Sequence, residues 1–515
     1  MKSKNFSINL ICQLIVFSTN IVINFFLTPY ILKKLGTEAY GFIGLINNFV
    51  NYLSVVTIAL NSMAGRYITL SYHKGEKETA EAYYSSVFFA NVILSIVVFT
   101  AAIVLTVNVS NWLNVPTVLL KDVRVTIILA AVNTIISLIT VVYGIAAFIK
   151  NKLYKNSMGQ MIAAIARACM MIVTFALFEA HMWYYTLAAI VAAVILLLVQ
   201  MRITSKLCPE LTIDIKKLQV KKISEIIKSG VWVSVESFNK ILQTGLDLLI
   251  SNVFVGVGAT GLLSIAKTIP NVLTQVTSTI AGVFNPELAR LYAENRMDDL
   301  KSEFLFTVRM LSFIMIVPLV GFIIFGREFY TLWLPQYSNE EVSLIQKLSV
   351  LTVLPLLVNA YVEGLYYANT LTNKIKGSVL ISLGFSVGGI ATELVLLNYT
   401  TIEPLFLIAG TSSVFLMIRY MVVTPLYSAY VLGLPLLTFY PVLIRTITVS
   451  GFIGGVFFIV EYTVPINSWF QLILCCGICG IIGYLFVLLT LLSRQERKKM
   501  LQLIKRKGKN AKNCL

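Results

Sequence analysis

Six charged side chains interrupt apolar segments that are long enough to cross a membrane. Four lie near the middle of the chain, and two lie in an earlier and a later segment: Glu236, Lys240, Asp247, Lys267, Arg167 and Arg309. One ionised group at bilayer depth costs roughly 2.5–3.5 kcal/mol, so six facing lipid would cost on the order of 15 kcal/mol. That is more than a typical net folding stability. We therefore expect these groups to face a protein interior or a water-filled cavity.

Four polar residues of this central region follow a helical spacing. Glu236, Lys240, Gln243 and Asp247 are separated by steps of four, three and four residues, which stacks them on one face of a helix. Glu236 and Lys240 could simply neutralise each other as a one-turn ion pair. That alternative does not account for Asp247, so the pattern favours a polar, cavity-lining face.

The elements that must position these residues are membrane-spanning helices. The chain has 515 residues, of which 57% are hydrophobic and 13% charged, whereas a soluble protein has about a quarter charged. Apolar runs of about 20 residues, enough to cross the hydrocarbon core, recur along the whole length. They predict an all-α polytopic membrane protein with about fourteen transmembrane helices, at roughly 8–30, 38–63, 85–108, 123–149, 158–178, 183–203, 229–254, 260–285, 304–326, 344–370, 377–397, 405–424, 441–461 and 468–492.

Positive charge orients the predicted helices. With the N-terminus in the cytoplasm, most of the 41 Lys and Arg residues fall in inside loops, as the positive-inside rule requires. Both termini are then cytoplasmic. The same basic segments account for much of the net charge of +17, so we expect them to meet anionic membrane lipids and not nucleic acid.

An internal repeat divides the chain. The motif Gly36-Thr-Glu-Ala-Tyr-Gly41 aligns with Gly256-Val-Gly-Ala-Thr-Gly261 at an offset of 220 residues, and the same offset pairs Asn51 with Asn271. Chance similarity between small-residue turns is the alternative. The copies occupy corresponding positions in two six-helix blocks that enter the membrane from the same side. Parallel repeats of this kind are typical of transporters whose substrate binds between the halves.

The repeat predicts two parallel six-helix lobes around a central cavity, with two extra C-terminal helices. The segment between the lobes alternates basic and apolar residues, which is typical of an amphipathic segment on the inner leaflet. The predicted parts are an N-terminal lobe at 1–203, the linker at 204–228, a C-terminal lobe at 229–424, helices 13 and 14 at 425–492, and a basic cytoplasmic tail at 493–515.

Lys267 precedes Pro270 by three residues, and the proline predicts a kink because it removes a backbone donor. The repeat pairs Lys267 with Asn47, the first of three asparagines on the second span (Asn47, Asn48 and Asn51). Two related helices thus carry polar residues at equivalent depth. We expect both to line the cavity, with the three asparagines and Gln243 hydrogen-bonding a sugar.

The predicted cavity carries more cations than anions, so it suits an anionic substrate. Lys and Arg donors match a diphosphate. Glu236, Asp247 and Glu363 are candidates for proton or sodium coupling, or for ion pairs, and Glu393 raises the same alternatives. Arg419 lies near the predicted inner face, where its long side chain could reach the headgroups.

Other sites are excluded by their context. Cys476-x-x-Cys479 has metal-ligand spacing but lies in an apolar run with no second ligand pair, so we predict no metal site and no cofactor. Asp298-Asp299 is similar to a glycosyltransferase metal motif, but no nucleotide-binding domain surrounds it. The chain also has no Gly-rich phosphate loop, so ATP hydrolysis is not expected.

Several short motifs resemble those of polysaccharide flippases. The stretch 28–42 and the later Asn61-Ser-Met-Ala-Gly-Arg66 resemble the N-terminal signature of Wzx-type members of the multidrug/oligosaccharidyl-lipid/polysaccharide superfamily. Gly258-Ala-Thr-Gly-Leu-Leu-Ser264 and Phe284-Asn-Pro-Glu287 look like the signature of their second half. The resemblance covers most of the chain and extends to the number of helices.

The resemblance implies a non-enzymatic function. Such a protein inverts an oligosaccharide carried on undecaprenyl diphosphate across the bacterial cytoplasmic membrane by alternating access, and polysaccharide polymerase machinery is a candidate partner. The family's cationic lumen would be represented here by Lys240, Lys267, Arg167 and Arg309. The first span lacks an internal arginine, which argues against the peptidoglycan-precursor flippases.

Two alternatives remain at this stage. A drug/cation antiporter of the same superfamily would resemble this chain with two fewer helices and an anionic cavity. A membrane glycan polymerase or ligase would need a large outer catalytic loop, and the longest predicted here, at roughly 327–343, is short.

Overall fold

Every element in the described part of the chain is helical. The computed structural model describes residues 2–244, 246–493 and 496–497, and the chain divides into two compact units, Met1–Ser264 and Ile265–Leu515. Eleven helical stretches among the described residues are long and apolar enough to cross a membrane. The all-α membrane fold is therefore confirmed, while the domain boundaries given above remain predictions.

The first unit begins with α1 (Lys2–His73), which bends at Gly36 between the predicted spans 8–30 and 38–63. Gly36 has a φ of 81°, in the left-handed region that glycine enters without steric cost. Its counterpart in the repeat, Gly256, has a φ of 128° and directly precedes α8 (Val257–Ala266). Both copies of the motif thus use a glycine to turn the chain into a helix.

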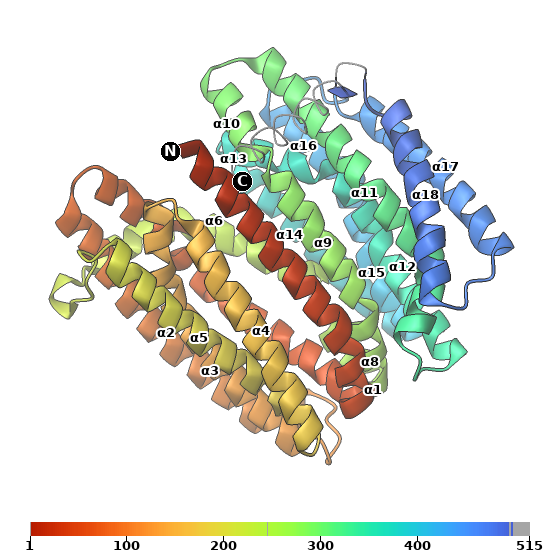
Figure 1. Ribbon diagram of the computed structural model, residues 1–515, viewed down its shortest axis with the longest axis horizontal. Coiled ribbons are helices and arrows are strands. Elements are labelled where there is room, and N and C mark those ends of the chain that lie inside the picture. Colours follow the sequence, from red (N-terminus) through yellow and green to blue (C-terminus); the bar gives the residue numbers. More distant parts are fainter. Residues whose placement is uncertain (1, 245, 494–495, 498–515) are drawn as a thin grey trace. The chain divides into compact units, whose positions relative to one another are not determined.

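Four helices complete the N-terminal bundle: α2 (Lys77–Trp112), α3 (Leu120–Ile149), α4 (Leu153–Leu177) and α5 (Trp183–Leu207). Figure 1 shows α2, α3 and α5 side by side, and α4 packs on α5. The core that they share with α1 contains apolar side chains that are almost fully buried, among them Phe42, Val123, Met171 and Phe175.

Residues 208–219 connect α5 to α6 (Val220–Thr244) and are held on the first turns of α2. The Glu81 carboxylate accepts hydrogen bonds from Lys217 Nζ and Thr212 Oγ1, and the amide of Gln219 donates to Ser86 Oγ at 2.9 Å. The hydrogen bond with Glu81 raises the pKa of Lys217. The predicted linker is therefore anchored on protein, and its placement on the inner leaflet remains a prediction.

Two predicted spans each cover two helices. The range 229–254 contains most of α6 and all of α7 (Leu246–Phe254), and 260–285 contains most of α8 and all of α9 (Thr268–Gly282). The kink predicted near Pro270 corresponds to the break at Lys267 between α8 and α9, while α6 and α7 lie on either side of residue 245, which is outside the described residues. These are also the segments that carry the central charges.

The second unit continues with α10 (Asn285–Ala293), α11 (Met297–Trp333), α12 (Asn339–Val362), α13 (Tyr367–Leu371), α14 (Ile375–Tyr399), α15 (Pro404–Ile418), α16 (Thr424–Val431), α17 (Tyr440–Thr463) and α18 (Trp469–Thr490). In Figure 1, α11 lies among α12, α17 and α18, and it contacts all three. A 3-10 turn at Glu363–Tyr366 follows α12, and a π-helical turn at Arg419–Val423 joins α15 to α16.

The predicted basic tail at 493–515 lies outside the described residues, apart from residues 493, 496 and 497.

Candidate functional site

The polar helix α6 is fixed along the second half of α1. Ser234 Oγ donates to the carbonyl of Val55 at 3.0 Å, and the hydroxyls of Ser229 and Tyr67 lie 2.6 Å apart. Gly230 allows the backbones to approach closely, because a Cβ there would collide with the Ala59 carbonyl. Both helices are thus held in register where the predicted site residues begin.

The predicted polar face of α6 is only partly buried. Asn239 is completely buried and Gln243 nearly so, and Gln243 Nε2 donates to Asn239 Oδ1 at 3.4 Å. Glu236 is half-buried, while Lys240 is exposed. The face therefore combines an accessible cation with a buried amide pair.

The middle of α1 packs against α7, which carries Asp247. A Cβ at Gly44 would lie 3.4 Å from Leu248 Cδ1, and two turns later Tyr52 lies within electrostatic range of the buried Asp247 carboxylate. Asn48 falls between these positions, on the same helical face. The predicted sugar-binding amides and the predicted coupling acid therefore occupy neighbouring helices.

Asn47 and Asn51 are exposed, and Asn48 is half-buried. Their amides are thus accessible on one side of α1.

Lys267 lies at the break between α8 and α9, and only 7% of the residue is exposed. Pro270 has no N–H to offer the carbonyl of Ala266, and Ser349 Oγ donates to that carbonyl at 2.7 Å instead. The Ser349 hydroxyl also lies 2.9 Å from that of Tyr330. A side chain from α12 thus stabilises the interruption that carries the buried cation.

Arg167 lies near the middle of α4. Its Nη2 donates to Asn24 Oδ1 on α1 at 3.2 Å, and its Nε is shielded from solvent with no partner among the described residues. Asn24 was not among the predicted site residues. In the sequence, Asn24 could have been recognised as an amide inside the first apolar span, one turn after Asn20.

Arg309 lies beside a carboxylate that balances its charge. Its Nε lies 3.2 Å from a Glu496 carboxylate oxygen and 3.2 Å from the carbonyl of Leu305. About a quarter of the Arg309 side chain is exposed. The ion pair ties α11 to the segment after α18, which the sequence did not indicate.

Glu363 begins the 3-10 turn after α12 and accepts a hydrogen bond from Asn359 Nδ2 at 3.0 Å. Arg419 is 4% exposed and stacks near the rings of Tyr366 and Tyr420, at 5.6 and 5.9 Å. The expectation that Arg419 extends to the headgroups is therefore wrong, because aromatic rings cover it. The chain keeps this cation in the protein interior, next to the π-helical turn.

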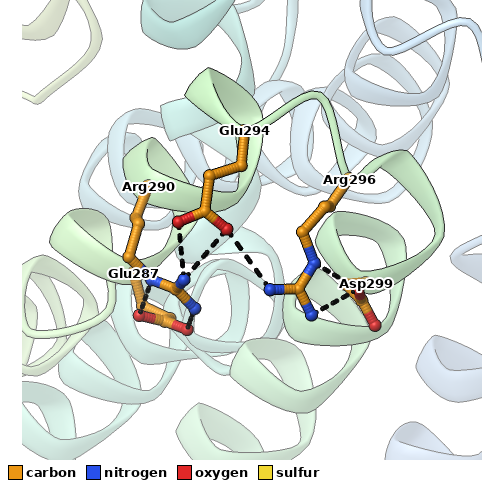
Figure 2. A network of polar contacts seen from close by, with 5 residues as sticks. All are labelled: Glu287, Arg290, Glu294, Arg296 and Asp299. Carbon is orange, nitrogen blue, oxygen red and sulfur yellow. Dashed lines mark hydrogen bonds and ion pairs between the residues drawn. The ribbon is translucent and has the colours of Figure 1, made fainter.

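An exposed network of ion pairs joins α10, the turn after it and the first turn of α11 (Figure 2). Arg290 binds Glu287 and Glu294, while Arg296 binds Glu294 and Asp299. Hydrogen bonds to Glu287 and Glu294 raise the pKa of Arg290. The Asp299 carboxylate, part of the Asp298-Asp299 pair, is thus engaged by an arginine.

Residues 34–338 match the family model described as polysaccharide biosynthesis protein. The chain belongs to this family. It is 28% identical over 469 residues to the uncharacterized membrane protein EpsK of Bacillus subtilis (strain 168), covering 91% of this chain and 92% of that protein. The family assignment confirms the predicted resemblance to polysaccharide flippases.

The fold is similar to those of solved transporters. The lipid II flippase MurJ, in an inward closed conformation, aligns over 93% of this chain and 97% of its own, with a TM-score of 0.65 and 12% identity. An inward-facing multidrug resistance MATE family transporter of the MOP superfamily aligns over 81% of this chain and 94% of its own, with a TM-score of 0.64 and 13% identity. This member of the polysaccharide biosynthesis protein family therefore has the fold of that superfamily.

Proposed function

We propose that the protein is a flippase that moves undecaprenyl-diphosphate-linked oligosaccharide, the repeat unit of a surface polysaccharide, from the inner to the outer leaflet by alternating access. It would act in the bacterial cytoplasmic membrane with both termini in the cytoplasm, and it would perform no covalent chemistry. Polysaccharide polymerase machinery would receive the product.

The observation that carries this proposal is the buried Lys267 at an interrupted helix. Discontinuous helices within a membrane fold mark the substrate sites of many transporters. A buried ammonium group is costly and is a strong donor to phosphate oxygens. Lys267 therefore supports an anionic substrate at this depth.

The other predicted residues have roles consistent with this substrate. Further positive charge for the substrate would come from Lys240, Arg167 and Arg309. The ion pair with Glu496 leaves less of the Arg309 charge available to the substrate. Sugar hydroxyls would be bound by the amides of Asn47, Asn48, Asn51 and Gln243. Transport would be coupled to protons or sodium by Glu236, Asp247 or Glu363.

The membrane potential also favours the proposed direction. Moving about two negative charges outward across an inside-negative membrane yields about 2.3 kcal/mol per charge per 100 mV.

The test compares Lys267→Ala with Lys74→Ala, an exposed lysine outside the predicted site. Each full-length variant is reconstituted in liposomes with a fluorescent undecaprenyl-diphosphate oligosaccharide. We expect flipping by wild type and Lys74→Ala, and at least tenfold slower flipping by Lys267→Ala. Equal rates for the two variants would refute the site, and absence of flipping by wild type would refute the function. Uptake of a cationic drug in place of the glycolipid would favour the antiporter alternative.

A further inference from the structure

Arg167 is an arginine that the described residues hold in place without a counter-charge. Of the five N–H donors of a guanidinium, one Nη2 proton is donated to Asn24, and the Nε proton has no partner within the described ranges. No carboxylate in those ranges forms an ion pair with Arg167. Its charge is thus available to a ligand.

Arg309 differs from Arg167 in having a carboxylate partner. Arg309 also lies within a long apolar helix, but Glu496 balances its charge at 3.2 Å. Arg167 sits near the middle of a 25-residue helix, where an unbalanced charge facing lipid costs roughly 2.5–3.5 kcal/mol. A neutral amide recovers only part of this cost, so the arrangement favours an anion that arrives from outside the protein.

Asn24 suits the task of orienting the guanidinium. It lies on the first half of α1, which packs beside α4, and it is exposed. Its amide oxygen accepts one hydrogen bond and carries no charge, so it fixes the side chain without cancelling the positive field. A carboxylate at the same position would form an ion pair and occupy the same donors.

We infer that Asn24 is a positioning residue, which holds the Arg167 guanidinium ready to bind the diphosphate of the lipid-linked glycan. This inference rests on the proposed function and deepens it. A planar guanidinium binds two phosphate oxygens at once, which distinguishes a diphosphate lipid from a neutral glycolipid. Phospholipid headgroups carry the same phosphate chemistry and are therefore a separate arm of the test.

The experiment measures binding of undecaprenyl diphosphate to the purified full-length protein in detergent. The variants are Arg167→Gln, Asn24→Ala and Asn24→Asp. Asn398→Asp is the matched control, because Asn398 is also exposed and its amide donates within its own helix, to the carbonyl of Leu394.

We expect roughly tenfold weaker binding for Arg167→Gln and for Asn24→Asp, since both remove the available charge. Asn24→Ala keeps the charge but loses its orientation, so binding falls by only a few fold. The double variant Arg167→Gln/Asn24→Ala binds no more weakly than Arg167→Gln alone, because Asn24 acts through this guanidinium. Asn398→Asp binds like wild type.

Several outcomes would overturn the inference. Wild-type binding by Asn24→Asp and Arg167→Gln, in a protein whose wild type flips the glycolipid, would refute this site and leave the function standing. Equal competition by phosphatidylglycerol vesicles would assign the arginine to headgroup phosphates instead. If Asn24→Asp fails to fold, as judged by gel filtration and melting, Arg167→Gln and Asn24→Ala still decide the question.

Discussion

Replacing Gly41 by alanine would push apart two helices that the repeat brings together. Gly41 on α1 and Gly261 on α8 are equivalent positions of the repeated motif, and in the structure they touch. A Cβ at position 41 would lie 2.7 Å from the amide nitrogen of Gly261 and 2.8 Å from its Cα. Both atoms are backbone, so no side-chain rotation relieves the collision.

The expected cost follows from this geometry. Restoring ordinary contact requires the helices to separate by about 0.7 Å, from 2.7 to 3.4 Å, and overpacking of this kind costs about 1–3 kcal/mol. Alanine recovers about 1 kcal/mol of helix propensity. Gly65→Ala is the matched control, because nothing lies within 4 Å of a Cβ at that position on the same helix.

The assay is thermal unfolding of the two purified variants in detergent. Gly41→Ala should melt below Gly65→Ala by an amount that reflects about 1–3 kcal/mol, at about 2–4 °C per kcal/mol for a unit of this size. Gly65→Ala should melt at or slightly above wild type. Equal melting temperatures for the two variants would refute the close approach of the two motif copies.

The remaining predictions concern two other polar contacts. Ser349→Ala leaves the carbonyl of Ala266 without its donor at the helix break, so it should destabilise the protein by about 1–3 kcal/mol, measured as a lower melting temperature; an unchanged one would mean that the break does not need this hydroxyl. Glu81→Gln weakens the contacts with Lys217 and Thr212 and should make the connection before α6 more accessible to protease, by several fold in cleavage rate, whereas equal cleavage of variant and wild type would contradict the anchoring.

Much of the fold could be predicted because its determinants are local. Apolar runs of the right length become helices in a membrane, since only a helix satisfies its own backbone. The bend at Gly36 lies between the first two predicted spans, in the repeated motif whose second copy has Gly256 directly before α8. Each of the fourteen predicted spans contains helix in the structure.

The errors come from contacts between residues far apart in the sequence. Pro270 indicated a kink, but the break at Lys267 also depends on a hydroxyl from α12. Likewise, the sequence does not distinguish Arg309 from Arg167, whereas in the structure Glu496 forms an ion pair with Arg309. Charge and hydropathy reveal that a group must be compensated, but not which distant residue compensates it.

The central claim is that the protein moves a lipid-linked oligosaccharide between leaflets. The most direct measurement uses liposomes containing a nitrobenzoxadiazole-labelled undecaprenyl-diphosphate oligosaccharide, to which membrane-impermeant dithionite is added. With the wild-type protein present, we predict that the reagent quenches label from both leaflets, and that a neutral glycolipid with the same glycan is flipped much more slowly. Quenching that stops at the outer leaflet, as in protein-free liposomes, would contradict the proposed function.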